Sequence, residues 1–147
     1  MKEIETFADQ LVKYANKYHV SDIHIVPRKQ DALIQLRMDQ ELVQKEIIPR
    51  SVCERLISHF KFLGGMDIGE RRKPQNGALT IGLEGNEVNL RLSTLPTSYD
   101  ESLVIRVLPQ DKITSMSHLA LFKKDTQKLI SLLKHSHGMI IFTGPTC

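Results

Sequence analysis

The sequence predicts an α+β domain with a mostly antiparallel sheet in its first 108 residues. An amphipathic helix pattern opens the chain, three strand-like runs follow it, and a second helix precedes three further runs. Short polar turns separate neighbouring strands within each group. The order helix, three strands, helix, three strands is typical of helices packed on an antiparallel sheet.

The two helices are indicated by the spacing of their apolar side chains. In residues 2–18, apolar side chains recur at three- and four-residue steps, as on one face of a helix. Residues 51–63 show a second such face, ended by Gly64-Gly65. Its apolar residues are Val52, Leu56, Ile57, Phe60 and Leu63.

The six strands are predicted from runs of β-branched and apolar residues bounded by turn residues. These runs are residues 23–26, 32–38, 42–47, 78–83, 87–94 and 102–108. Asp39-Gln40 indicates a tight turn between the second and third strands. The fourth and fifth form a hairpin around residues 84–86.

The rest of the chain predicts a linker and the start of a second domain. Residues 109–117 are mixed and polar, a helix is expected over 123–135, and a buried strand over 139–142. That strand runs into Gly144, Pro145, Thr146 and Cys147, which match the opening of a phosphate-binding loop. The second glycine, the lysine and the magnesium-binding hydroxyl of such a loop would lie beyond Cys147. We therefore expect the front part of a nucleotide hydrolase, cut inside this loop and not hydrolytic by itself.

Composition narrows the function classes. Hydrophobic content of 41% and charged content of 25% are ordinary for a globular protein. A net charge of +3 is too small to indicate nucleic-acid binding without a clustered patch, so no direct contact with nucleic acid is expected. Cys53 and Cys147 lack metal-ligand spacing, and no metal site is expected. No run reaches the length of a membrane span, which favours a cytoplasmic protein.

Two arginines interrupt the strand pattern. Arg91 alternates with apolar neighbours, whereas Arg106 shares a strand face with Val104 and Leu108. A guanidinium in apolar company must extend to water, pair with an acid or meet an anion. The residue pattern alone favours an ion pair. The acids expected as partners are Glu87, Asp100 and Glu101.

Other polar residues are better explained by structure than by chemistry. The basic cluster at residues 71–73 indicates a solvated surface, with an anion or subunit contact as the alternative. His24 is expected to be a hydrogen-bonded structural histidine. His135 and His137 are expected near a helix C-terminus, where imidazolium complements the helix dipole. Capping and loop solubility account for the acids at positions 22, 67 and 70.

Five short motifs follow one another along the chain. They are Ser21-Asp22-Ile23-His24-Ile25, residues 70–77, residues 91–97, residues 104–108 and Thr143-Gly144-Pro145-Thr146. Taken together, these motifs resemble those of the secretion ATPases, which power type II secretion, type IV pilus assembly and DNA-uptake pili. Each motif is weak alone, but the five follow the family's order and cover most of the chain. Within the family the chain looks most like the competence ATPases.

The resemblance implies a PAS-like N-terminal domain over residues 1–108, a hinge over 109–117 and a RecA-like motor beginning at 118. It implies a homo-hexamer that uses ATP and Mg²⁺ in the full-length protein. It also implies a platform partner at the inner membrane, and hence a cytoplasmic location at its inner face. By motif, Arg91 and Arg106 match the arginines that reach the ATP phosphates in this family, so both are candidate catalytic residues.

Two departures from the family pattern and two other functional hypotheses accompany the resemblance. Asn76-Gly77-Ala78 stands where members often have Asp-Gly-Arg, and Cys147 stands where they usually have glycine. The alternative function is a protein-interaction module that docks the motor onto the platform protein or a regulator. A small-ligand sensor is a weaker third hypothesis, because no polar cluster falls among the predicted core positions.

Overall fold

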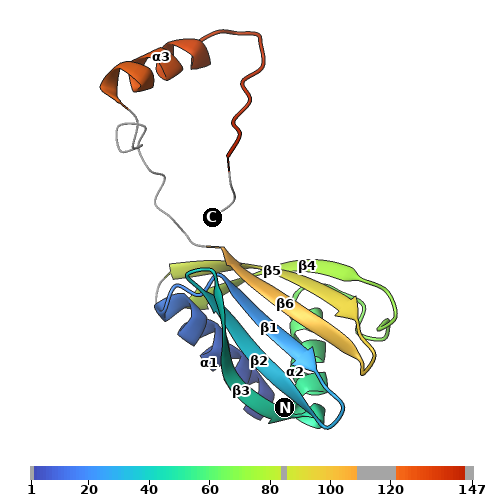
Figure 1. Cartoon of the computed structure of the whole chain (residues 1–147). Helices are drawn as coiled ribbons and strands as arrows, with labels where there is room; N and C mark the ends of the chain where they lie inside the picture. The colour runs from blue at the N-terminus through green and yellow to red at the C-terminus, as the bar shows by residue number, and fades with distance from the viewer. Residues whose placement is uncertain (1, 84–85, 109–121, 145–147) are drawn as a thin grey trace. The chain divides into compact units, whose positions relative to one another are not determined.

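The computed structural model describes residues 2–83, 86–108 and 122–144. The chain divides into two units, residues 1–110 and 111–147, and each is described by itself. The first unit contains one sheet and two helices, and the second contains one described helix (Figure 1).

A six-stranded antiparallel sheet forms the body of the first unit. Its strand order is β3-β2-β1-β6-β5-β4, so two three-stranded meanders are joined by pairing between β1 and β6. This confirms the predicted order of elements and the antiparallel sheet. The strands are β1 (Asp22–Pro27), β2 (Asp31–Met38), β3 (Glu41–Pro49), β4 (Gln75–Leu83), β5 (Asn86–Pro96) and β6 (Glu101–Leu108).

Two helices, α1 (Lys2–Lys17) and α2 (Arg50–Leu63), cover one face of the sheet (Figure 1). Helix α2 contacts β1, β2 and β3, and α1 packs against α2. The buried stripe of α2 differs from the predicted one at its end. Leu63 is 43% exposed, and Lys61 is buried instead.

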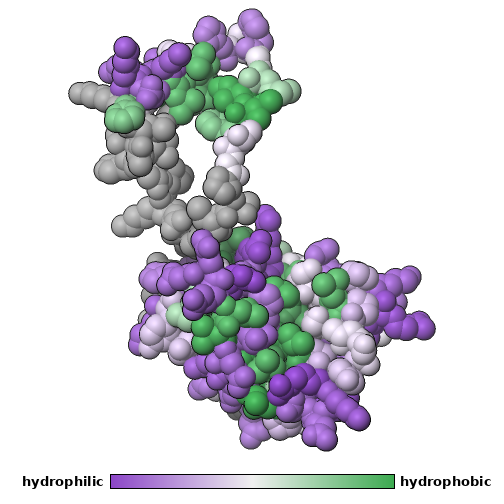
Figure 2. Space-filling view, viewed as in Figure 1, coloured by the Kyte–Doolittle hydropathy of each residue, from purple (hydrophilic) through white to green (hydrophobic). Residues whose placement is uncertain are grey.

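No described helix of the first unit covers the opposite face of the sheet. Side chains alternate along β2 and β6, every second one being buried against the helices. The remaining side chains make up the open face, where apolar residues lie among hydrophilic ones (Figure 2). The predicted candidate arginines lie on this open face.

The turns follow the expected chemistry. Asp39 and Gln40 have φ angles of 47° and 72°, as a tight two-residue turn between antiparallel strands requires. The hairpin of β4 and β5 is confirmed by the pairing of Leu83 with Asn86, and residues 84–85 lie outside the described residues. Ile34 pairs with Glu46 and Gln35 pairs with Gln44, so Lys45 is the extra residue of a bulge in β3.

The second unit departs from two predictions. Helix α3 (Lys123–Leu133) ends two residues before the predicted end at 135. The predicted buried strand at residues 139–142 is wrong: these residues form no strand and their side chains are exposed. A strand needs a neighbouring strand for its backbone hydrogen bonds, and the described part of this unit offers none. The predicted hinge at 109–117 lies outside the described residues.

Candidate anion-binding site

Strand register places the two candidate arginines side by side. Arg91 of β5 lies directly opposite Arg106 of β6. Asp22 of β1 lies opposite Arg106 on one side and opposite Arg37 of β2 on the other. These four residues form one row across four neighbouring strands, here named the arginine row. Directly opposite residues in an antiparallel pair are about 4.5–5.5 Å apart, so their charges interact.

Alternation explains why the arginine row lies on the open face of the sheet. Ile105 and Val107 are buried beneath the helices, so Arg106 between them must point to the open face. Its side chain is 64% exposed. The sequence-based assignment of Arg106 to the face of Val104 and Leu108 is confirmed, and that face is only half-buried.

Asp22 is the acid within the row. Its Oδ1 accepts a hydrogen bond from Arg106 Nε at 2.8 Å, and its Oδ2 accepts one from Ser21 Oγ at 2.9 Å. Arg37 Nε lies 3.6 Å from Oδ2. Burial raises the pKa of the Asp22 carboxyl, but the hydrogen bonds from Arg106 and Ser21 outweigh it and hold the pKa below its ordinary value.

The partner of Arg106 differs from the acids expected. Within the described ranges, Glu87, Asp100 and Glu101 make no ion pair with Arg106. Glu101 is buried against Lys61, and Asp100 pairs with an arginine of the 71–73 loop. The actual partner, Asp22, is 84 residues away in sequence. The expected capping or loop role of Asp22 is wrong, because the residue is buried and lies in β1.

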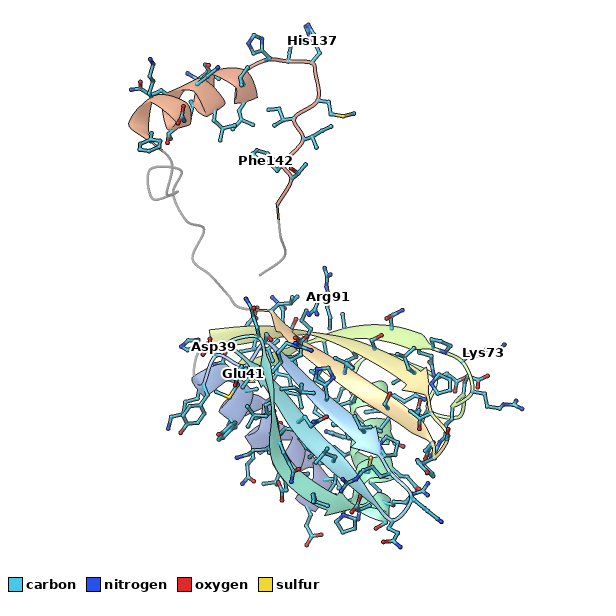
Figure 3. All side chains as sticks on the ribbon, viewed as in Figure 1. Asp39, Glu41, Lys73, Arg91, His137 and Phe142 are labelled. Carbon is cyan, nitrogen blue, oxygen red and sulfur yellow. The ribbon has the colours of Figure 1, made fainter. Side chains whose placement is uncertain are left out.

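Arg91 has no acid of its own. No hydrogen bond or ion pair of its side chain occurs among the residues that the structure describes. Figure 3 shows Arg91 extending away from the sheet. The row holds three arginines and one aspartate, which gives 3 − 1 = 2 excess positive charges. This excess suits an anion that carries several negative charges.

A hollow of about 410 Å³ adjoins Arg91 and Arg106. Ser93 and Asn76 line it and are joined by a hydrogen bond of 2.9 Å. Gly77 also lines it, and a Cβ at that position would lie 2.7 Å from the carbonyl oxygen of Gly64. Glycine therefore lets β4 lie close to the end of α2.

His24 lies two residues along β1 from Asp22, on the same face of the sheet, opposite Gln35 and Val104. Its Nε2 is buried and has no hydrogen-bond partner among the described residues, so the expected hydrogen-bonded histidine is not found at this atom. Burial lowers the pKa of His24, and the nearby arginines at 37 and 106 lower it further against the opposing effect of Asp22.

Lys61 is the buried charge that sequence reasoning missed. Its Nζ donates hydrogen bonds to both carboxylate oxygens of Glu101, at 2.8 and 2.9 Å, and to the carbonyl oxygen of Glu70 at 2.7 Å. The last bond anchors the loop that carries Arg71. Helical spacing could have predicted the burial of Lys61, because position 61 lies four residues after Ile57 on the apolar stripe of α2.

Of the predicted phosphate-binding loop, only the first residue is described. Gly144 is exposed, and Pro145, Thr146 and Cys147 lie outside the described residues. No cluster of three potential metal ligands occurs in the ranges 2–83, 86–108 and 122–144. None of the helices described there is long and apolar enough to cross a membrane.

Comparison with known proteins identifies similar chains. The type II/IV secretion system protein family matches residues 1–147. The competence protein ComGA of Bacillus subtilis is 57% identical over 146 residues, covering 99% of this chain and 41% of that protein. ComGA of Halalkalibacterium halodurans is 42% identical, covering 99% and 42%. The type IV pilus assembly ATPase TfpB of Acinetobacter baylyi is 35% identical, covering 99% and 25%. The chain thus spans less than half of each relative.

Proposed function

Because this chain belongs to the type II/IV secretion system protein family, we propose that it is the regulatory, phosphate-sensing region of a hexameric ATPase. That motor would power assembly of a competence pilus for DNA uptake. The similarity to two competence proteins and to a type IV pilus assembly ATPase supports the choice of process.

One observation carries the proposal: Arg91 and Arg106 lie opposite each other, in a row where Asp22 is the one acid beside three arginines. The two guanidinium groups would meet the phosphates of ATP, which is the substrate of the whole protein. Guanidinium groups bind phosphate oxygens through paired N–H groups and stabilise the charge that develops there during phosphoryl transfer. The fit of a phosphate chain to the arginine row rests on the row's excess positive charge and on the adjoining hollow.

The remaining parts of the assembly are proposals of the same kind. The first unit would be a PAS-like domain, and the second would begin a RecA-like motor whose phosphate-binding loop starts at Gly144. Mg²⁺ would accompany ATP, held by groups other than the described residues of this chain. The ring would act at the inner face of the cell membrane on a platform protein.

The test replaces Arg106 or Arg91 by Ala in the full-length protein and measures ATP turnover. Turnover is expected to fall at least about a hundredfold, as for other arginines that contact a transferring phosphoryl group. Arg28→Ala is the matched control, because Arg28 makes an exposed ion pair with Asp31 outside the arginine row. Unchanged turnover in folded Arg91 and Arg106 variants would refute phosphate sensing.

A second candidate is the protein-interaction module. A hollow of about 520 Å³ lies between α1 and α2, and Phe62 on its rim is 69% exposed. An exposed aromatic side chain beside such a hollow is typical of a protein contact. Phe62→Ser would then abolish docking to the platform protein and leave ATP turnover unchanged. Intact docking of that variant would count against this candidate.

A further inference from the structure

We propose that Asp22 competes with phosphate for Arg106, so that an anion engages Arg91 first and Arg106 only after the ion pair opens. This inference rests on the proposed function, because it concerns regulation at the same site. It assigns Asp22 the role of an internal anion that limits how tightly the row binds phosphate.

The two arginines differ in the free chain. Arg106 already has a carboxylate at 2.8 Å, whereas Arg91 has no acidic partner in the part of the chain that the structure describes. Arg91 is therefore ready to bind an anion without breaking any contact. Arg106 already gives its Nε–H to Asp22, so a phosphate that takes the Nε side of the guanidinium must first displace that carboxylate.

Burial shows which partner would move. The Asp22 side chain is 5% exposed, and its backbone lies in β1, a strand paired on both sides. The Arg106 side chain is 64% exposed and extends into solvent. A long, exposed side chain reorients easily, while a short carboxylate on a central strand stays in place.

Asp22 would not be left unpaired when Arg106 leaves. Ser21 Oγ still donates to its Oδ2, and Arg37 Nε lies 3.6 Å from the same oxygen. A buried carboxylate without partners would be costly, so this second arginine makes the exchange feasible. Arg37 thus neutralises the aspartate while Arg106 is bound to phosphate.

The experiment titrates inorganic tripolyphosphate into the 147-residue chain by calorimetry. Asp22→Asn keeps the shape of the side chain and removes its charge, so binding should tighten about threefold to tenfold. The gain should shrink as salt is raised, because the freed charge is exposed. Asp31→Asn is the matched control: it removes the carboxylate of the Arg28 ion pair outside the row and should leave affinity unchanged.

A double-mutant cycle isolates the mechanism. If Asp22 acts by competing for Arg106, then Asp22→Asn should give no gain in an Arg106→Ala background. Weaker binding by folded Asp22→Asn, or an equal gain without Arg106, would overturn the inference. Arg91→Ala that binds as tightly as the parent chain would instead refute the phosphate site itself, so the two failures are distinguishable.

A measurement on the unaltered chain needs no stable variant. The Nε–H proton resonance of Arg106 reports its hydrogen bond to Asp22 directly. At saturating tripolyphosphate this resonance should shift together with that of Arg91. If only Arg91 responds, Arg106 keeps its aspartate and the exchange does not occur.

Discussion

Replacing Lys61 by Met tests whether the buried ion pair holds the first unit together. Lys61 is 0% exposed and Glu101 is 4% exposed, so both charges are removed from water. Lys61→Met keeps a long apolar stem and removes the ammonium group. The Glu101 carboxylate then loses both hydrogen bonds from Nζ, and the Glu70 carbonyl loses its own bond from Nζ.

The expected cost follows from leaving one buried charge without a partner. Breaking a buried pair in this way costs about 3–5 kcal/mol, against a total stability of about 5–15 kcal/mol for a domain. The double variant Lys61→Met with Glu101→Gln removes both charges and should recover much of that loss. The difference between the two measures the coupling across the pair.

Urea unfolding followed by far-ultraviolet circular dichroism provides the measurement. The midpoint should fall while the slope m stays constant, because the surface exposed on unfolding is unchanged. Hydrogen exchange should also quicken in the 67–74 loop, because the Glu70 carbonyl keeps only its hydrogen bond from Gln75 Nε2. A cost below about 1 kcal/mol at constant m, the range of exposed pairs, would refute the buried arrangement.

Three further predictions concern single positions. Burial raises the pKa of Cys53 to about 11, so roughly one Cys53 thiol in a thousand is ionised at pH 8. In a Cys147→Ser background, a disulfide reagent should therefore leave Cys53 of the native protein unmodified at pH 8. Rapid labelling of the native protein would contradict this. Burial lowers the pKa of His24 below 6.5, so the unfolded chain takes up a proton first as pH falls; the free energy of unfolding should decrease below about pH 6.5, and less so in His24→Gln. Gly77→Ala brings a Cβ within 2.7 Å of a backbone oxygen and should cost about 1–3 kcal/mol in thermal unfolding; Gly82→Ala meets nothing within 4 Å and should be neutral or slightly stabilising.

Local patterns predicted the architecture of the first unit well. Apolar periodicity located α1, α2 and all six strands, because each element buries one face and alternation records that face in the sequence. Arg106 was assigned to the correct strand face for the same reason. The strand at 139–142 was wrong, because an apolar run shows hydrophobicity and not whether a neighbouring strand exists to pair with it.

Long-range partners could not be read from the sequence. Nearby acids were expected beside Arg106, but the sheet brings Asp22 to it across 84 residues. That pairing depends on the register of β1 against β6, which no local pattern encodes. Glu101, the nearest of the expected acids, instead points into the core toward Lys61. The juxtaposition of Arg91 with Arg106 required the register of β5 in the same way.

The join between the two meanders has a consequence for how the chain folds. β1 and β6 are far apart in sequence, so their association is a slow, non-local step. A shift of β6 by one residue would turn Ile105 toward water and drive the guanidinium of Arg106 into the apolar interior. The cost of burying this guanidinium therefore disfavours the shifted register, and the salt bridge to Asp22 favours the observed one. Arg106→Leu would remove that check, and refolding yields should drop through misassembly even where the correctly closed domain is stable.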